Sequence, residues 1–235
     1  MDDTATASPG TRFEPRVGEG SGGPKPSMRQ LWSDQVAFTR QYVIAAVAGR
    51  PVSEVLTKLL GQAVAPIATA PGVRELVPKF SDGDAAAVGL LTTMEATAEA
   101  LEAHIGEDSA KELVSLLRRH VFIAVELLSA ARSGHIERFK KEDERWIASA
   151  SEIATFLSSV NQNWPREVLE QHLQLLLQLT KDEAIARIAG SSRVDLRTYD
   201  AIREEAMVIA DLMEEGLARN FPPTRAARTG EGAHD

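Results

Sequence analysis

The sequence predicts an all-α protein, an antiparallel bundle of six or seven helices. Apolar residues recur at i, i+3, i+4 and i+7 along most of the chain, Gly and Pro separate these stretches, and no stretch of any length alternates like a strand. With 235 residues and 43% hydrophobic content, the chain can bury one good core or two small ones. We therefore expect one helical domain over residues 28–222, with disordered tails at 1–27 and 223–235.

The N-terminal half is expected to hold three helical segments. Ser27 and Gln30 form a capping box that opens the first helix, and Gly49 closes it. The predicted inner face of this helix consists of Leu31, Gln35, Phe38, Tyr42, Ala45 and Ala46. A second segment starts at Pro51 and is interrupted by Pro66, and a third helix is expected over residues 84–104.

The stretch from Leu113 to Gly134 is the most apolar helical run, and it carries His120 inside its apolar stripe. Asp108 or Ser109 is expected to cap its start. Because the residues after His120 are apolar nearly all round, this helix is predicted to be central, with neighbours on more than one side. His120 then points into the bundle, either as a core histidine satisfied by one hydrogen bond or as a ligand for a metal or substrate.

Three more helices are expected at about 135–159, 165–188 and 192–220. Pro165 suits the first turn of the second of these, and Ser192 with Asp195 resembles a capping box for the third. The predicted stripe of the last helix is Leu196, Tyr199, Ile202, Ala206, Ile209, Met213 and Leu217.

Composition and missing motifs exclude several classes of function. The net charge of −8 argues against a broad nucleic-acid surface, and no apolar run reaches the ~18–20 residues that cross a bilayer. The chain has no cysteine, which excludes disulfides and thiolate sites and suits a reducing cytosol. No P-loop, nucleophile elbow or H-E-x-x-H motif occurs, so we expect no cofactor. From the charge, the apolar runs and the lack of cysteine, we expect a cytoplasmic protein without membrane or nucleic-acid partners.

Several short stretches are similar to motifs of a bacterial family of all-helical bundle proteins that is known by motif rather than by an established activity. They are LWSDQVAFTR, LLRRHV, SEIATFL, NQNWP, LTKDEA and YDAIR followed by IAD. The family patterns include L-W-x-x-H-x-x-W-T-R, L-L-x-x-H-[IV] and Y-D-x-x-H. The resemblance covers about 28–50 and 83–222, leaving 51–82 as an apparent insertion.

The chain departs from this family at its histidines. Gln35, Leu176 and Arg203 stand where the family has histidine, and Ala96 stands where it has an aspartate. The matching residues are Arg40, His120, Glu152, Asp195, Tyr199, Asp200 and Asp211. The resemblance implies that the family's inward histidines and acids form a metal or ligand site. This chain has lost most of that set, so we expect no metal.

Three charged residues, Arg40, Glu126 and Asp211, lie within apolar runs. An unpaired buried charge would cost several kcal/mol. Arg40 is therefore expected to pair with Glu126 or Asp211, either to fix helix register or as the polar floor of a ligand pocket. Arg203 is expected to face the interior as a fixed positive charge.

These observations predict a non-enzymatic helical bundle that binds a small molecule or a protein partner, with a homodimer left open. The candidate ligand-binding residues are Arg40, His120, Glu126, Glu152, Tyr199, Arg203 and Asp211. One alternative is a metal-binding enzyme or metal carrier that uses His120 with Glu152, Asp195 or Asp211. Another is a purely structural dimerisation module.

Overall fold

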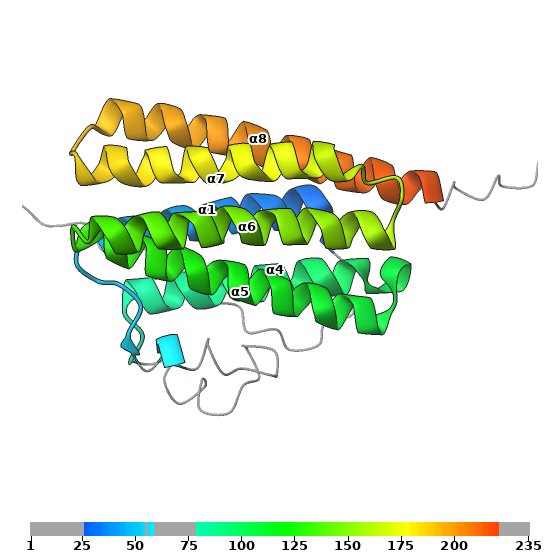
Figure 1. Cartoon of the computed structure of the whole chain (residues 1–235), viewed down its shortest axis with the longest axis horizontal. Helices are drawn as coiled ribbons and strands as arrows, with labels where there is room; N and C mark the ends of the chain where they lie inside the picture. Colours follow the sequence, from blue (N-terminus) through cyan, green and yellow to red (C-terminus); the bar gives the residue numbers. More distant parts are fainter. Residues whose placement is uncertain (1–25, 55, 59–78, 221–235) are drawn as a thin grey trace, which may run out of the picture.

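The computed structural model describes residues 26–54, 56–58 and 79–220, and its fold is all-α. Six long helices make up this part of the chain, and no strand occurs in it. The helices are α1 (Met28–Val47), α4 (Asp82–Ile105), α5 (Glu107–Arg132), α6 (Ile136–Val160), α7 (Arg166–Ile188) and α8 (Ser192–Asn220). The predicted helical bundle is confirmed (Figure 1).

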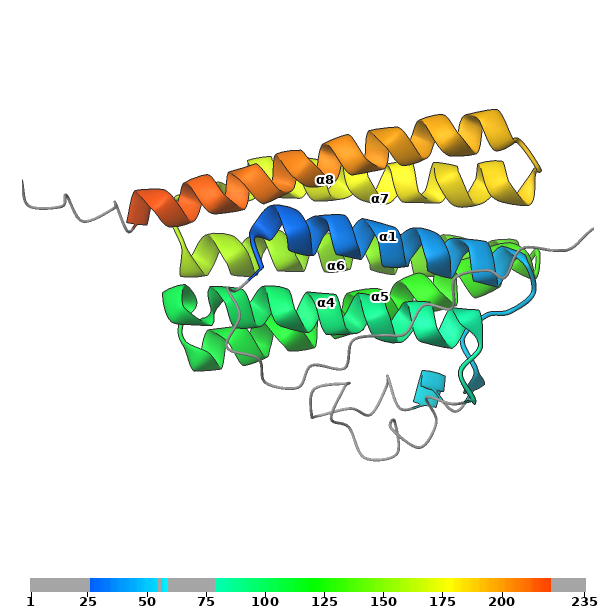
Figure 2. The same cartoon turned by 180° about the vertical axis from the view of Figure 1, so that it is seen from behind.

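The six helices close a ring in chain order. Each packs against the next one along the chain, and α8 returns to pack against α1. Figures 1 and 2 show three layers of antiparallel helices, with α7 and α8 in the first, α1 and α6 in the second, and α4 and α5 in the third. Neighbours are antiparallel because only a few residues separate most consecutive helices.

The expectation that the stretch around His120 forms a central helix is wrong in one respect. This stretch lies in α5, which has the predicted neighbours on more than one side, namely α4, α6 and α1. However, α5 is one of six helices in the ring, and none of the described helices lies in the middle of the ring. The apolar residues around α5 therefore pack against its neighbouring helices and also line the space inside the ring.

Local sequence sets the helix ends. The Ser27 hydroxyl accepts a hydrogen bond from the Gln30 backbone amide at 3.2 Å, which is one half of the predicted capping box. The Gln30 side chain donates to Asp34 at 2.8 Å instead of completing the box. Ser81 and Asp84 form a reciprocal capping box at the start of α4. Gly106, with φ of +85°, is the single residue between α4 and α5, a backbone conformation that glycine adopts readily. Because this one residue turns the chain, α5 begins at Glu107, before the predicted caps Asp108 and Ser109.

Two predictions for α8 are corrected. Ser192 is the first helical residue rather than a cap, and the Asp195 carboxylate binds arginine side chains instead of closing a capping box. The sequence predicts Leu196 on the inner stripe of this helix, but its side chain is 57% exposed. The buried positions Asp195, Ile202, Ile209 and Met213 follow a spacing that leaves Leu196 one residue off the face.

The remaining organisational predictions fall mostly outside the described residues. The two predicted disordered tails lie outside the described residues, apart from residues 26 and 27. Residues 55 and 59–78 of the apparent insertion lie outside them as well. Within the described ranges, none of the helices combines the length and apolarity that a membrane span needs.

Candidate functional site

A cavity of about 160 Å³ runs inside the ring, and side chains from all six helices line it. Its wall is mainly apolar, with leucine, valine, isoleucine and alanine side chains contributed by every helix. An apolar cavity of about 150 Å³ stays dry and is large enough to bind benzene. The space inside this bundle is therefore comparable in size to a small-molecule site.

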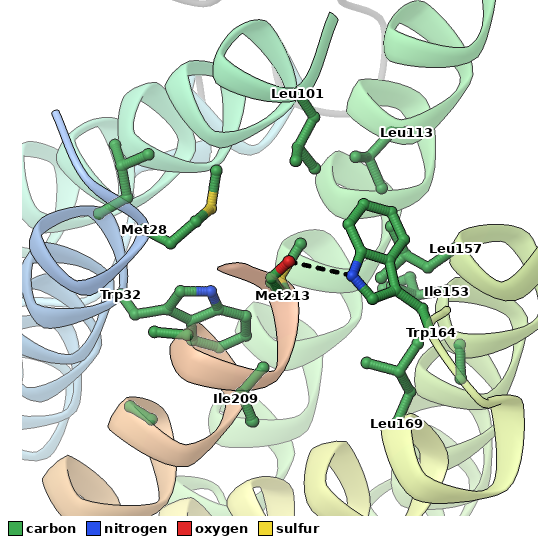
Figure 3. Close-up of a cluster of buried hydrophobic side chains, with 14 of the residues drawn as sticks. Met28, Trp32, Leu101, Leu113, Ile153, Leu157, Trp164, Leu169, Ile209 and Met213 are labelled. Atoms are coloured by element: carbon green, nitrogen blue, oxygen red, sulfur yellow. Dashed lines mark hydrogen bonds between the residues drawn. The ribbon is translucent and has the colours of Figure 1, made fainter. Parts of the chain in front are cut away.

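One end of the cavity is closed by a cluster of large buried side chains. Trp164 is completely buried there, and its indole Nε1 donates a hydrogen bond to the Met213 carbonyl at 3.1 Å. Figure 3 shows Trp164 beside Leu113 and Leu169, with Trp32 across the cluster. Trp164 lies in the turn between α6 and α7, and the other residues come from the N-terminal parts of α1, α5 and α7 and from the last turns of α8.

The cavity reaches the surface near the C-terminal end of α7. Ile185 and Ile188 belong to its wall, yet they are 53% and 46% exposed. Lys181 lines the same region and is tied to Asp143 of α6 by an ion pair at 2.8 Å. A ligand would therefore meet apolar side chains at the mouth, while the nearest lysine already has a carboxylate partner.

The His120 side chain lines the cavity, and its contact with Ser149 defines which ring nitrogen carries the hydrogen. Its Nδ1 lies 2.7 Å from the Ser149 hydroxyl, and Ser149 donates its hydroxyl hydrogen to the Trp146 carbonyl at 2.7 Å. Because a hydroxyl carries a single hydrogen, His120 Nδ1–H must be the donor to Ser149. His120 Nε2 therefore carries the lone pair, and it has no hydrogen-bond partner among the described residues.

Burial keeps the His120 ring neutral. Desolvation lowers the pKa of His120 from 6.5 to about 4, because the charged imidazolium would lose its water. The ring also stacks on Trp146, with centroids 5.5 Å apart and planes 28° from parallel. At neutral pH His120 is consequently a hydrogen-bond acceptor held in a fixed orientation.

Two tryptophans of the cavity wall carry buried indole N–H groups without acceptors. Trp32 Nε1 and Trp146 Nε1 have no hydrogen-bond partner among the described residues. A buried donor without an acceptor costs roughly 1–3 kcal/mol and is rare in folded proteins. Both indole N–H groups are completely buried, so they lie beneath the surface of the wall and do not face the open space.

Gln35 occupies the position where the family motif has its first histidine. It is buried in the cavity wall, as predicted for the inner face of the first helix, and its amide nitrogen donates to the Thr97 hydroxyl at 3.0 Å. The residue therefore links α1 to α4 as a neutral polar pair.

Arg40 lies in a charged network between α1, α7 and α8. Its guanidinium pairs with Glu183 and with Asp195, at 3.2 Å for the latter, and it lies 4.1 Å from the centre of the Tyr199 ring. Arg187 donates to Asp195 Oδ2 at 2.5 Å, an oxygen that also accepts from Arg40 at 3.3 Å. Two cations and two anions balance each other in this network. Burial raises the pKa of Glu183, while the positive charges of Arg40 and Arg187 oppose the shift.

The predicted pairing of Arg40 with Glu126 or Asp211 is therefore wrong. Glu126 pairs with Arg138 on the next helix, and Asp211 pairs with Arg29 at 2.5 Å while 43% of its side chain is exposed. The apolar run around Asp211 misled the prediction because it covers both sides of α8, including the exposed Val208.

The remaining candidates also lie away from the cavity. Glu152 is half exposed and pairs with Arg119, and Arg203 is exposed instead of facing the interior. Arg203 follows the buried Ile202 directly, so helical geometry turns it outward. Of the seven proposed ligand-binding residues, only His120 lines the cavity, while Arg40 and Tyr199 meet in the charged network.

The described residues do not gather His120 with the acids proposed for a metal site. No group of three or more His, Cys, Asp or Glu side chains in that part of the chain could hold a metal ion. His172, one turn before Leu176, lies 2.6 Å from Glu205 instead. The metal-site alternative thus finds no ligand set in the described residues.

Sequence reasoning missed Ser149, the unpartnered indoles, and Glu183 with Arg187. A usable signal existed for the first of these. His120 and Ser149 lie 14 and 15 residues from Gly134, and positions equally far from the turn of a helical hairpin face each other.

We compared the chain with models of known protein families, with curated proteins and with solved structures. None of them matches. The kinship suggested by the order of the short motifs stays a prediction. The candidate site is accordingly argued from the geometry of this chain alone.

Proposed function

We propose that the protein is a non-enzymatic binding protein for a small apolar molecule, which occupies the cavity inside the helical ring. The observation that carries this proposal is a mainly apolar cavity of about 160 Å³ that all six helices line and that opens beside the exposed Ile185 and Ile188. An apolar molecule gains free energy when it leaves water for such a wall.

A binding role fits the charges of the site better than catalysis does. His120 is held neutral by burial, far from the pKa near 7 that suits acid–base chemistry. The carboxylates of Glu183 and Asp195 are engaged by arginines, and Lys181 is engaged by Asp143. The charged groups thus serve helix packing in this proposal, and the cavity serves the ligand. A cysteine-free chain also suits a cytoplasmic location.

Toluene, a small apolar probe, tests the proposal. Toluene should bind the full chain with measurable heat in calorimetry and should raise its melting temperature, because a ligand that binds only the folded state stabilises it. Ala124→Phe, which fills the cavity from α5, should abolish both effects.

Ser115→Phe is the matched control, because Ser115 lies on the exposed side of the same helix and outside the cavity wall. It should leave toluene binding unchanged. Binding that survives Ala124→Phe, or the absence of any toluene binding to the wild-type chain, would contradict the proposal.

A protein partner is the second candidate, and exposed apolar side chains favour it. Ile136, Ile185 and Ile188 are all exposed at the end of the bundle where α5 ends, α6 begins and α7 ends. Contacts between copies of the chain through this surface would appear as a concentration-dependent mass in light scattering, and Ile136→Lys with Ile185→Lys should abolish them.

A further inference from the structure

The cavity inside the ring is long and narrow. Its wall reaches from Leu113 to Ala131 along α5 and from Leu169 to Ile188 along α7. Each of these stretches measures about 27 Å along the helix axis, because an α-helix rises about 1.5 Å per residue. A volume of about 160 Å³ that extends over most of the length of the bundle has room for a slender molecule rather than a broad one.

The two ends of the cavity differ. The inner end is closed by the buried cluster around Trp164, and the outer end opens beside the exposed Ile185 and Ile188. A ligand that fills the cavity therefore has one end inside an apolar core and the other end at the water. The inner end of the ligand must be apolar, because burying a polar group without a partner is costly. The outer end can be polar, because water reaches it.

The ionisable side chains of the wall do not select a charged ligand. They are Tyr42, His120 and Lys181 among the described residues. Burial raises the pKa of Tyr42 and lowers the pKa of His120, so both side chains are neutral at pH 7. Lys181 is paired with Asp143 at 2.8 Å. The part of the ligand that lies inside the cavity is therefore expected to be hydrocarbon.

We propose that the ligand is an amphiphile with a single unbranched alkyl or acyl chain, which lies along the bundle axis with its terminal methyl group towards Leu113 and its polar end beside Ile188. This inference rests on the proposed function and deepens it. An unbranched chain is the slimmest hydrocarbon, and it can extend along the cavity while its polar end stays in water. A ring or a branched hydrocarbon with the same number of carbons is shorter and wider, so it fits a narrow space less well.

A series of unbranched primary alcohols from 1-butanol to 1-decanol tests the chain inference on the full-length protein by calorimetry. Each added methylene should tighten binding by up to about fourfold, the effect of removing one methylene from water. Toluene binding without any gain along the alcohol series would reject the chain inference and leave the proposed function standing. Failure of toluene and of all the alcohols to bind would reject both proposals.

A variant of the inner half of the cavity shows where the chains bind. Leu117 lines the cavity four residues from Leu113, so Leu117→Trp should fill the inner half. The gain in affinity should then end at a shorter alcohol than in the wild-type chain, because further methylenes would stay in water. Ser115→Trp is the matched control, because Ser115 lies on the exposed side of the same helix and outside the cavity wall. It should keep the wild-type series. The same gain along the series in both variants would place the chains outside the cavity and overturn the inference.

An NMR measurement on the wild-type chain needs no variant that could fail to fold. 1-Decanol labelled with carbon-13 at the terminal methyl or at the first methylene gives nuclear Overhauser effects to the side chains that each end contacts. The terminal methyl should show effects to the stacked rings of His120 and Trp146, since His120 lies between the two ends of the cavity wall on α5. The first methylene should show them to Ile185 or Ile188. A terminal methyl in contact with Ile185 or Ile188 instead would overturn the inference.

Discussion

At the scale of single residues, the environment decides which polar groups are available to a ligand and which serve the fold. His120 and Arg40 lie in similar apolar runs of the sequence, but their surroundings in the structure differ. His120 has one hydrogen-bonding partner, Ser149, and keeps a free lone pair. Arg40 is surrounded by Glu183, Asp195 and Tyr199.

The depressed pKa of His120 makes stability depend on pH. The folded pKa of about 4 lies below the unfolded value of 6.5, so this stability is complete above pH 6.5 and is lost as pH falls from 6.5 towards 4. Between pH 7.5 and 5 the loss from His120 should be about 2 kcal/mol. His120→Gln should therefore lose less stability over this range than wild type when urea unfolding is measured at both pH values. Equal losses would show that His120 is solvated.

The charged network gives a second prediction through two aspartates of the same helix. Asp195→Ala leaves two partly buried arginines, Arg40 and Arg187, with only Glu183, and it should destabilise by about 3–5 kcal/mol. Asp211→Ala removes a solvent-exposed pair with Arg29 and should cost less than about 1 kcal/mol. Urea unfolding of both variants checks this contrast. Similar costs for the two changes would contradict the assignment of Asp195 as the buried acid.

At the scale of elements, the turn between α6 and α7 docks on the last turns of α8. Asn161 donates from its side chain to the Gly216 carbonyl at 3.2 Å, and Trp164 reaches the Met213 carbonyl. A Cβ at Gly216 would lie 2.1 Å from Trp164 Nε1, closer than atoms can approach. The glycine in α8 is thus required by this close approach, although glycine is unfavourable within a helix.

Gly216→Ala should therefore be destabilising, by about 1–3 kcal/mol as for other overpacked sites, although alanine is the better helix former. Trp164→Leu removes the indole that the new methyl group would strike. In the double variant the cost of Gly216→Ala should shrink, so the two changes should be less than additive in urea unfolding. A stabilising effect of Gly216→Ala alone would refute the close approach.

At the scale of the whole molecule, the ring closes only when α8 packs against α1. The last helix contributes Ile202, Ala206, Ile209 and Met213 to the same core cluster as Leu31 and Trp32 of the first. Contacts between the two ends of the chain therefore complete both the core and the wall of the cavity.

This closure predicts that α8 is indispensable. A chain ending at Ser191 should lose its cooperative thermal transition, because the apolar faces of α1 and α7 would be exposed to water. A chain ending at Pro222 is the control, and it should melt like the full-length protein, because the sequence predicts a disordered tail at residues 223–235. A sharp transition in the chain ending at Ser191 would show that five helices suffice.

The sequence by itself determined the helices and most of their ends, because apolar periodicity, caps, glycines and prolines act over a few residues. Ser27, Gly49 and Pro165 each mark a boundary within two residues of where the structure has it. It also predicted that His120 and Gln35 face inward, since both lie in a clear apolar stripe.

Only the tertiary structure decided how these helices enclose a cavity and which charges meet. An apolar run tells which residues avoid water, but it does not tell whether they face a neighbouring helix, an empty space or the edge of the bundle. Arg40 therefore pairs with Glu183 and Asp195 rather than with Asp211. The buried indole N–H of Trp146, whose ring stacks on His120, has no partner among the described residues. Pairing between helices depends on their rotation and register, and these are settled by packing across the whole ring.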